Sequence, residues 1–258
     1  MSAAQRVTVI TGAGRGIGAA LARRFAALGH RLELTNLDAA ELEVVRGELP
    51  AQTVAGSAAF DLRDRRACES WIRGIRERHA RLDVLLLNAG VGGPDPEDDV
   101  EALFHLRQVL EVNATAVMRA MRGLGDLLPG DGSGRIVVTA SILGRMGVAG
   151  FSAYCASKAA VIGLVRAAAL EFARKRITVN AICPGWTDTA MAQQGFEAIA
   201  RAGAGDPVAA RREVEAGLPL GRIVRPEEVA GLAAFLAGPD AGAMTGQALL
   251  MDGGDLQK

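Results

Sequence analysis

The stretch VTVITGAGRGIG at residues 7–18 decides the fold, because it joins a β-branched run to four glycines at alternate positions. β-branched residues favour a strand, whereas glycines permit a tight turn and a close approach of the backbone to a ligand. Residues 19–28 then follow a helical pattern that ends at Gly29. This order predicts a phosphate site formed by backbone amides and the positive end of a helix. The turn lacks the Gly-Lys-Ser/Thr sequence of a nucleoside triphosphatase loop, so the sequence does not support such a loop.

Strand and helix patterns alternate along the rest of the chain. Strands are expected at residues 7–10, 31–35, 54–60, 84–87, 135–139, 177–182 and 248–251. Helices are expected at residues 19–28, 39–49, 64–79, 103–127, 152–175 and 226–236. The strand runs are apolar throughout, as in parallel strands that are covered on both faces. The sequence therefore predicts a single α/β domain over residues 1–258, with a doubly wound parallel sheet of about seven strands and helices on both faces.

The composition excludes several classes of function. Acidic and basic residues are equal in number, 29 of each, and aromatic residues make up only 4% of the chain. We therefore expect no nucleic-acid partner and no membrane partner. Three scattered histidines and three widely spaced cysteines predict neither a metal site nor a disulfide framework. No apolar run has the length of a membrane span, and the first strand begins too early for a signal peptide, so we expect a cytoplasmic protein.

The only tyrosine of the chain, Tyr154, precedes Lys158 by four residues. Residues with this spacing lie on the same face of a helix. A nearby ammonium favours the phenolate, so the pair predicts a phenol that exchanges protons near neutral pH. An amphipathic helix whose tyrosine packs while its lysine faces water would have the same spacing.

Further motifs occur in a fixed order along the chain. They are NAG at residues 88–90, SILG at 141–144, YCASK at 154–158, PGWTDTAM at 184–191, RPEEV at 225–229 and DGG at 252–254. Together with the glycine-rich turn, this order resembles the short-chain dehydrogenase/reductase family over essentially the whole chain. The resemblance implies a Rossmann-type fold, NAD(P) as the cofactor, and hydride transfer between a ketone and a secondary alcohol.

The resemblance also implies catalytic roles for four residues. Tyr154 would be the general acid or base, and Lys158 would lower its pKa and bind the nicotinamide ribose. Ser141 would hold the carbonyl oxygen of the substrate. Asn113 would hold a water that links Lys158 to solvent. A simpler interpretation of Asn113 is a side chain that bonds a neighbouring turn or faces solvent.

The expected cofactor contacts follow the strand ends and the family motifs. They are Gly12, Arg15, Gly16, Ile17, Gly18, Asn36, Asp61, Leu62, Asn88, Ala89, Gly90, Tyr154, Lys158, Pro184, Gly185, Thr187 and Thr189. Asp61 is expected to accept a hydrogen bond from the adenine amino group. Its alternative role is as the N-cap of the next helix, for which Asp64 is the better candidate. Thr187 and Thr189 are expected to bond the nicotinamide carboxamide and a phosphate.

One position departs from the pattern of NAD-specific enzymes. Their second strand ends in an acid that bonds the ribose 2′-hydroxyl, and here that position is Asn36. Asparagine bonds a hydroxyl but does not repel a 2′-phosphate, and Arg15 could pair with such a phosphate. Asp38 adds negative charge nearby. The sequence therefore slightly favours NADP(H) over NAD(H).

Three functions remain open at this point. They are an alcohol, polyol, sugar or cyclic-alcohol dehydrogenase, a 3-oxoacyl thioester (acyl-carrier-protein) reductase, and a nucleotide-sensing regulatory protein without turnover. The intact catalytic residues argue against the last. The resemblance implies a homotetramer, or less often a dimer, built on the helices at 103–127 and 152–175. Ala149, Phe151, Trp186 and a substrate loop at about 187–220, with short mobile helices at 190–218, are expected to surround a small carbonyl or alcohol substrate.

Overall fold

One parallel sheet runs through the molecule in the strand order β3-β2-β1-β4-β5-β6-β7. The computed structural model describes residues 5–257. The strands are β1 (Val7–Thr11), β2 (Arg31–Asn36), β3 (Val54–Ala59), β4 (Val84–Leu87), β5 (Arg135–Thr139), β6 (Thr178–Pro184) and β7 (Ala248–Met251). Every neighbouring pair is parallel. The predicted Rossmann-type α/β fold with a seven-stranded parallel sheet is confirmed.

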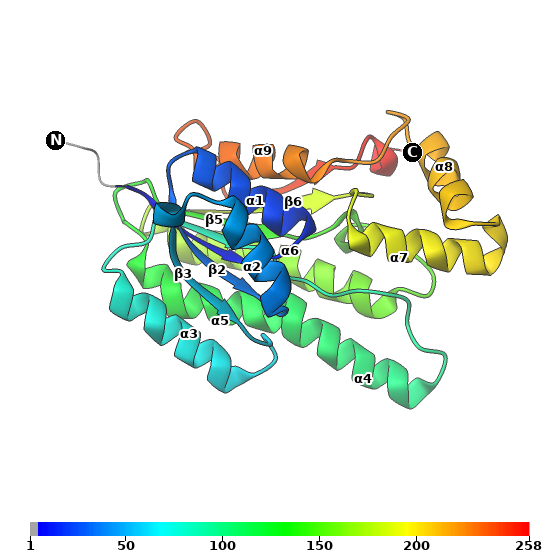
Figure 1. The fold of residues 1–258 in the computed structure, drawn as a ribbon, viewed down its shortest axis with the longest axis horizontal. Helices are drawn as coiled ribbons and strands as arrows, with labels where there is room; N and C mark the ends of the chain where they lie inside the picture. The colour runs from blue at the N-terminus through cyan, green and yellow to red at the C-terminus, as the bar shows by residue number, and fades with distance from the viewer. Residues whose placement is uncertain (1–4, 258) are drawn as a thin grey trace.

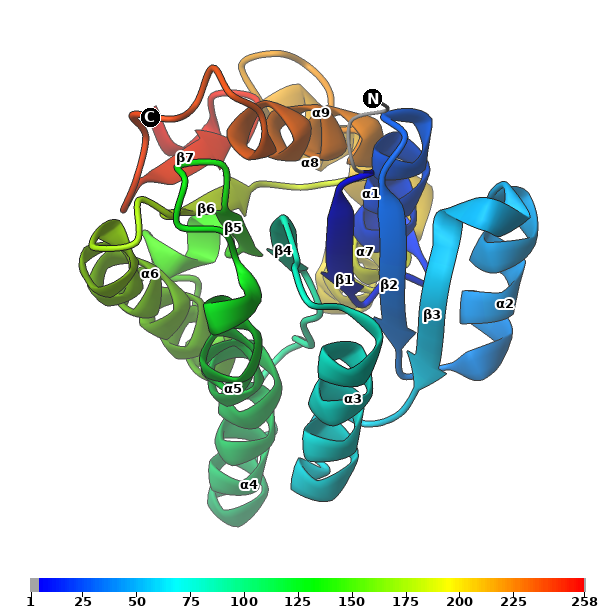
Figure 2. The same ribbon diagram turned by 90° about the vertical axis from the view of Figure 1, so that its left-hand side faces the viewer.

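Helices cover both faces of the sheet (Figure 2). They are α1 (Gly16–Ala27), α2 (Ala39–Glu48), α3 (Arg65–Arg78), α4 (Asp99–Leu110), α5 (Ala116–Leu124), α6 (Ser152–Ala173), α7 (Ala190–Ile199), α8 (Pro207–Gly217) and α9 (Pro226–Ala237). Short 3-10 turns lie at Ala51–Thr53, Gly125–Leu127, Ile142–Gly144 and Asp255–Gln257. One core lies between the sheet and α3, α5 and α6, and a second lies between the sheet and α1, α2 and α9. The apolar strands therefore bury both faces, as their uniform hydrophobicity predicts.

The helix expected at residues 103–127 differs from the prediction. Helix α4 begins earlier, where Asp98 accepts hydrogen bonds from the amides of Val100 and Glu101. A π-helical segment, Glu111–Thr115, then interrupts the α-helical pattern before α5. π-bulges of this kind occur frequently at functional sites, and this one contains Asn113. An apolar periodicity does not reveal such an insertion, because the residues on either side remain helical.

The segment after β6 forms helices, as predicted, with a π-helical stretch at Ala200–Ala204 between α7 and α8. Helices α7 and α8 have 10 and 11 residues and lie together at one end of the molecule (Figure 1). Trp186 stacks on Phe196 of α7 with ring centroids 5.0 Å apart. With Leu218 and Ile223 these side chains belong to a third, small hydrophobic core. Trp186 therefore packs against this small core and also lines a cavity with Ile199 and Val214.

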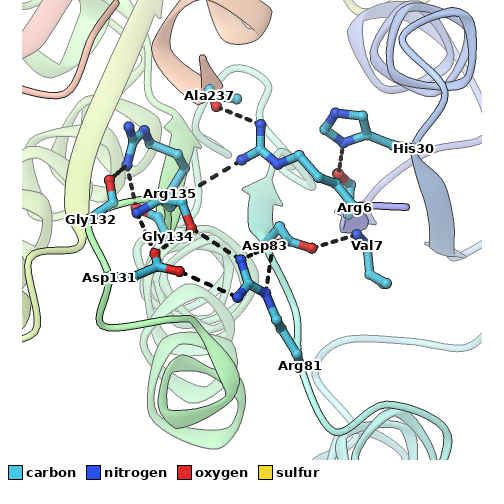
Figure 3. Close-up of polar contacts among 12 residues, drawn as sticks. Arg6, Val7, His30, Arg81, Asp83, Asp131, Gly132, Gly134, Arg135 and Ala237 are labelled. Atoms are coloured by element: carbon cyan, nitrogen blue, oxygen red, sulfur yellow. Dashed lines mark hydrogen bonds and ion pairs between the residues drawn. The ribbon is translucent and has the colours of Figure 1, made fainter. Parts of the chain in front are cut away.

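Charged side chains stabilise the opposite, amino-terminal edge of the sheet (Figure 3). Arg6 donates to the carbonyl of Ala237 at 3.1 Å, and Arg135 donates to that of Gly238 at 3.2 Å. Both carbonyls lie at the C-terminal end of α9, where helical carbonyls need partners. The carboxylate of Asp83 accepts from the first amide of β1 at 2.8 Å. These contacts join β1, β4, β5 and α9 at the edge that faces away from the carboxyl ends of the strands.

Helix α6 is long and apolar enough to cross a membrane by length and composition alone. In the structure it packs as a core helix, with Val161, Ile162 and Val165 buried against the sheet. Its hydrophobicity is therefore accounted for by the protein interior.

Candidate active site

The predicted site residues meet at the carboxyl edge of the sheet. Thr11, Asn36, Leu87, Thr139 and Pro184 are the last residues of β1, β2, β4, β5 and β6. The chain order reverses between the neighbouring strands β1 and β4. Ligands of open parallel sheets bind in the crevice at such a reversal. The strand order therefore places the glycine-rich turn next to the residues that follow β4 and β5.

The glycine-rich turn has no room for side chains at its centre. A Cβ added at Gly18 would lie 1.7 Å from the carbonyl oxygen of Gly12. Gly12 and Gly16 have φ angles of 66° and 52°, in the left-handed region that favours glycine. Arg15 is the N-cap of α1, and its own side chain does not bond this helix end. The first turn of α1 also lacks acidic residues. This helix end is suited to hold an anionic group such as a pyrophosphate.

Asn88 joins the ends of three strands. Its Nδ2 donates to the carbonyls of Thr11 and Gly12, each at 3.2 Å, and its Oδ1 accepts from the hydroxyl of Thr139 at 3.0 Å. The Thr11 hydroxyl accepts from the amides of Asn88 and Ala89 at 3.0 and 3.1 Å. These bonds fix the position of the NAG segment relative to the glycine-rich turn.

Ser141, Tyr154 and Lys158 come together beside this segment. Ser141 is buried at the start of the 3-10 turn after β5, where its hydroxyl accepts from the amide of Leu143 at 3.1 Å and lies close enough to Tyr154 to lower the pKa of the phenol. The Lys158 Nζ lies 5.6 Å from the centroid of the Tyr154 ring. Lys158 is buried, and its Nζ donates to the carbonyl of Thr139 at 3.0 Å. The ammonium therefore points into the site rather than to water, unlike the lysine of a simple amphipathic helix.

Burial controls the proton affinities of this pair. It raises the pKa of Tyr154 to about 12, although the hydrogen bond with Ser141 acts in the opposite direction. It lowers the pKa of Lys158 to about 8. The sequence predicts that Lys158 lowers the pKa of Tyr154, whereas the net shift in this structure is upward. The reason is that removing the phenolate from water costs more than its neighbours offset.

Asn113 fastens the loop after β4. Its Oδ1 accepts from the amide of Val91 and its Nδ2 donates to the carbonyl of Val91, both at 2.8 Å. The Nδ2 also donates to the hydroxyl of Ser157 at 2.9 Å, and this hydroxyl donates to the carbonyl of Tyr154 at 2.8 Å. Asn113 thus bonds a loop, as its simpler interpretation proposes. The sequence pattern did not identify Val91 or Ser157 as its partners.

Asn36 has an acidic partner that the sequence analysis missed. Its Nδ2 donates to Glu41 Oε2 at 3.0 Å and to the carbonyl of Asp38 at 2.9 Å. The other oxygen of Glu41 accepts from Arg15 at 3.2 Å. Glu41 lies in the first turn of α2. An acidic residue so soon after the second strand was the sequence signal that could have indicated a carboxylate near Asn36. Glu41 thus places a carboxylate beside Asn36, and this carboxylate pairs with Arg15, the arginine expected to bind a phosphate.

Asp61 and Leu62 follow β3 at the same edge. Asp61 forms an ion pair with Arg63 at 2.6 Å, which holds the pKa of the carboxyl below its ordinary value. Asp64 is the N-cap of α3, as predicted. Leu62 and Ala89 line one small cavity. Asp61 is therefore free of a capping role but is bonded to a neighbouring arginine.

The segment after β6 approaches the glycine-rich turn from the other side. A Cβ at Gly16 would lie 3.0 Å from the methyl carbon of Thr189. Thr189 caps α7, and Thr187 donates its hydroxyl hydrogen to the carbonyl of Gly185 at 3.0 Å. Pro184 ends β6, and the amide of Gly185 donates to the carbonyl of Met251 in β7. Thr189 therefore lies beside the glycine-rich turn at the start of α1.

Comparison with known proteins identifies the family. Residues 12–255 match the family model described as enoyl-(acyl carrier protein) reductase. The chain belongs to the short-chain dehydrogenase/reductase family. It is 38% identical over 258 residues to cis-4-hydroxycyclohexanecarboxylate dehydrogenase of Sinomonas cyclohexanicum, covering 97% of this chain and 96% of that protein. The predicted family is therefore confirmed, and with it an oxidoreductase of the NAD(P)-dependent type.

Solved structures of this family have the same fold. A Phe-to-Trp variant of actinorhodin polyketide ketoreductase with NADPH has a TM-score of 0.88 and 36% identity, over 97% of both chains. Levodione reductase has a TM-score of 0.87 and 30% identity, over 96% of both chains. These short-chain dehydrogenases/reductases act on different substrates by name, so the family alone does not specify the substrate.

Proposed function

We propose that this short-chain dehydrogenase/reductase interconverts a ketone and a secondary alcohol, with Tyr154 as the general acid or base. The observation that carries the proposal is a buried phenol beside Ser141 and close to the buried ammonium of Lys158. These groups lie next to a glycine-rich helix N-terminus that fits a pyrophosphate. A nicotinamide dinucleotide, when bound, supplies or accepts the hydride.

Each polar group then has a distinct role. Tyr154 protonates the developing alkoxide during reduction and removes the alcohol proton during oxidation. Ser141 donates a hydrogen bond to the substrate oxygen as its negative charge develops. Lys158 binds the nicotinamide ribose and adds positive charge beside the phenol. Asn113 holds the loop after β4 in place, and we retain for it the expected link through water to Lys158.

The cofactor contacts proposed from the sequence are compatible with the geometry. The glycine-rich turn and Thr189 would hold the pyrophosphate, and the NAG segment would contact the ribose. Asp61 would release Arg63 and accept a hydrogen bond from the adenine amino group. Pro184, Gly185 and Thr187 would surround the nicotinamide. The close approach of Thr189 to Gly16 supports this arrangement, because it brings both halves of the site to one helix end.

We retain NADP(H) as the preferred cofactor, on the condition that its 2′-phosphate displaces Glu41 from Arg15. Arg15 pairs with Glu41, so a 2′-phosphate has to replace Glu41 as the partner of Arg15. The NADPH in the ketoreductase structure supports this choice, whereas the charge of Glu41 opposes it. Fluorescence titration of NADPH and NADH against the wild type and Glu41→Gln tests the point. NADPH affinity should rise in the variant while NADH affinity changes little; equal changes for both would contradict the condition.

Two substrate classes have support from relatives. One relative is named for a hydroxycyclohexanecarboxylate and one structure for a polyketide ketone. We propose that a cyclic ketone or its alcohol binds under the loop at residues 187–220. A 3-oxoacyl thioester is the second choice of substrate. The enzyme would work in the cytoplasm.

Turnover of a panel of such ketones and alcohols, followed by dihydronicotinamide absorbance, tests the function. Tyr154→Phe should bind dinucleotide as the wild type does and lose nearly all turnover. If the wild type binds dinucleotide but converts no member of the panel, the result favours the nucleotide sensor. Binding of neither dinucleotide would contradict both functions.

We also propose association into a homotetramer or dimer through α4 and α6. Leu103 and Phe104 on α4 are 60% and 62% exposed, and Leu170 on α6 is 77% exposed. Exposed apolar side chains on both helices are compatible with a protein contact there. A second copy of the chain is the partner that the family resemblance implies.

A further inference from the structure

Helix α6 begins without a cap from its own sequence. Its N-cap residue is Phe151, whose side chain does not bond the helix end. The cap comes from Asp95, which is 57 residues away along the chain. The Asp95 carboxylate accepts from the amide of Ser152 at 2.6 Å and from that of Ala153 at 3.1 Å. An acid at this position also interacts favourably with the helix dipole.

The same residue is bonded through its backbone. The amide of Asp95 donates to the carbonyl of Gly150 at 2.7 Å, immediately before the helix. Three hydrogen bonds therefore connect Asp95 to residues 150–153. Tyr154 is the next residue and lies in the first turn of α6. Because the first amides of a helix have no partner within the helix, Asp95 satisfies the helix end whose first turn carries the phenol.

The residues before Asp95 contact Tyr154 directly. Val91 is held through both its amide and its carbonyl by Asn113. Gly92 lies against the phenol ring, since a Cβ there would be 2.6 Å from Cδ2 and 2.7 Å from Cε2 of Tyr154. We call residues 91–95 the clamp. It is fastened to Asn113 at one end and to the start of α6 at the other, with the ring of Tyr154 between them.

We propose that Asp95 is a positioning residue, which holds Tyr154 through the clamp and connects its position to that of the NAG segment. The proposal rests on the function proposed above. A general acid acts only within hydrogen-bond reach of the reacting oxygen. A displacement of about 1 Å can reduce turnover about 100-fold. The NAG segment directly precedes the clamp, so the residues expected to contact the cofactor and the phenol share one continuous support.

The chain offers a matched control. Asp98 caps α4 with two hydrogen bonds of 2.9 Å and lies only three residues from Asp95. Asp98→Ala removes a cap of the same type from a helix end that does not carry Tyr154. Asp95→Ala removes the proposed support, and Asp95→Asn retains an oxygen that can cap. Gly92→Ala keeps the cap but places a methyl group against the ring.

Tyr154 is the only tyrosine, so protein labelled with ¹³C-tyrosine has a single tyrosine signal. We expect Asp95→Ala and Gly92→Ala to shift or broaden this signal, and Asp98→Ala to leave it unchanged. With a substrate from the panel, Asp95→Ala should lower kcat about 10- to 100-fold with little change in dinucleotide affinity. Asp95→Asn should recover most of that loss, and Asp98→Ala should stay within about twofold of the wild type.

An unchanged signal in Asp95→Ala, or an equal change in Asp98→Ala, would overturn the proposal. So would equal kcat values in the two alanine variants. If Asp95→Ala does not fold, Asp95→Asn provides the test: because its oxygen still caps the helix, it should keep the tyrosine signal and most of the turnover, and loss of both would overturn the proposal. A wild type that turns over no substrate would contradict the proposed function alone, because the tyrosine signal reports on the clamp without any turnover.

Discussion

The pKa of Tyr154 provides the most direct test of the site. Burial raises it to about 12 in this structure. At pH 10, therefore, only about 1% of the protein should carry a phenolate, whereas an ordinary tyrosine would be about half ionised. The unfolded chain ionises near pH 10 and the folded chain does not. The shift thus stabilises the folded state fully below pH 10, and this contribution is lost as the pH rises toward 12.

The measurement is simple because the chain has one tyrosine. Ultraviolet difference absorbance between pH 7 and 10.5 reports phenolate formation, and circular dichroism confirms that the protein stays folded over this range. Guanidinium-unfolded protein is the matched control and should titrate near pH 10. A folded-state midpoint at or below pH 10 would refute the reasoning that burial outweighs the neighbouring groups.

A second arm tests the connection to function. The oxidised dinucleotide carries a positive charge on its nicotinamide ring, and a nearby positive charge favours the phenolate. Saturation with oxidised dinucleotide should therefore lower the midpoint, whereas reduced dinucleotide should lower it less. Equal midpoints with both forms would show that the ring does not approach Tyr154.

Three further predictions concern stability, binding and assembly. Arg78→Ala should lower the free energy of unfolding by about 2 kcal/mol, because it removes an ion pair with two hydrogen bonds from the buried Glu33. Urea denaturation measures this free energy, and a change under about 0.5 kcal/mol would contradict the prediction. Gly18→Ala should abolish dinucleotide binding in a fluorescence titration, since its Cβ would lie 1.7 Å from the Gly12 oxygen, and wild-type affinity would be the contrary result. Phe104→Glu should reduce the sedimentation coefficient if α4 forms the subunit contact, whereas an unchanged assembly would place the contact elsewhere.

The sequence was enough to predict those features that depend on residues close together along the chain. The alternation of apolar runs and helical patterns was enough for the parallel sheet, because each strand and helix carries its own periodicity. The position of Asp64 was enough for the cap of α3. The order of the motifs around Tyr154 and Lys158 was enough for the family. These features depend on spacing along the chain, which a sequence displays directly.

Tertiary structure alone decided how these residues act on one another. Glu41 supplies a carboxylate beside Asn36, and Asp95 caps a helix that begins 57 residues later. The upward pKa shift of Tyr154 also required the structure, because it depends on how much water the folded chain excludes from the phenol. Hydrogen bonds and burial between distant segments form only when the sheet brings the strand ends together. Residue types and spacing therefore determined the chemistry available to this protein, and the packing of the carboxyl edge determined its partners and its proton affinities.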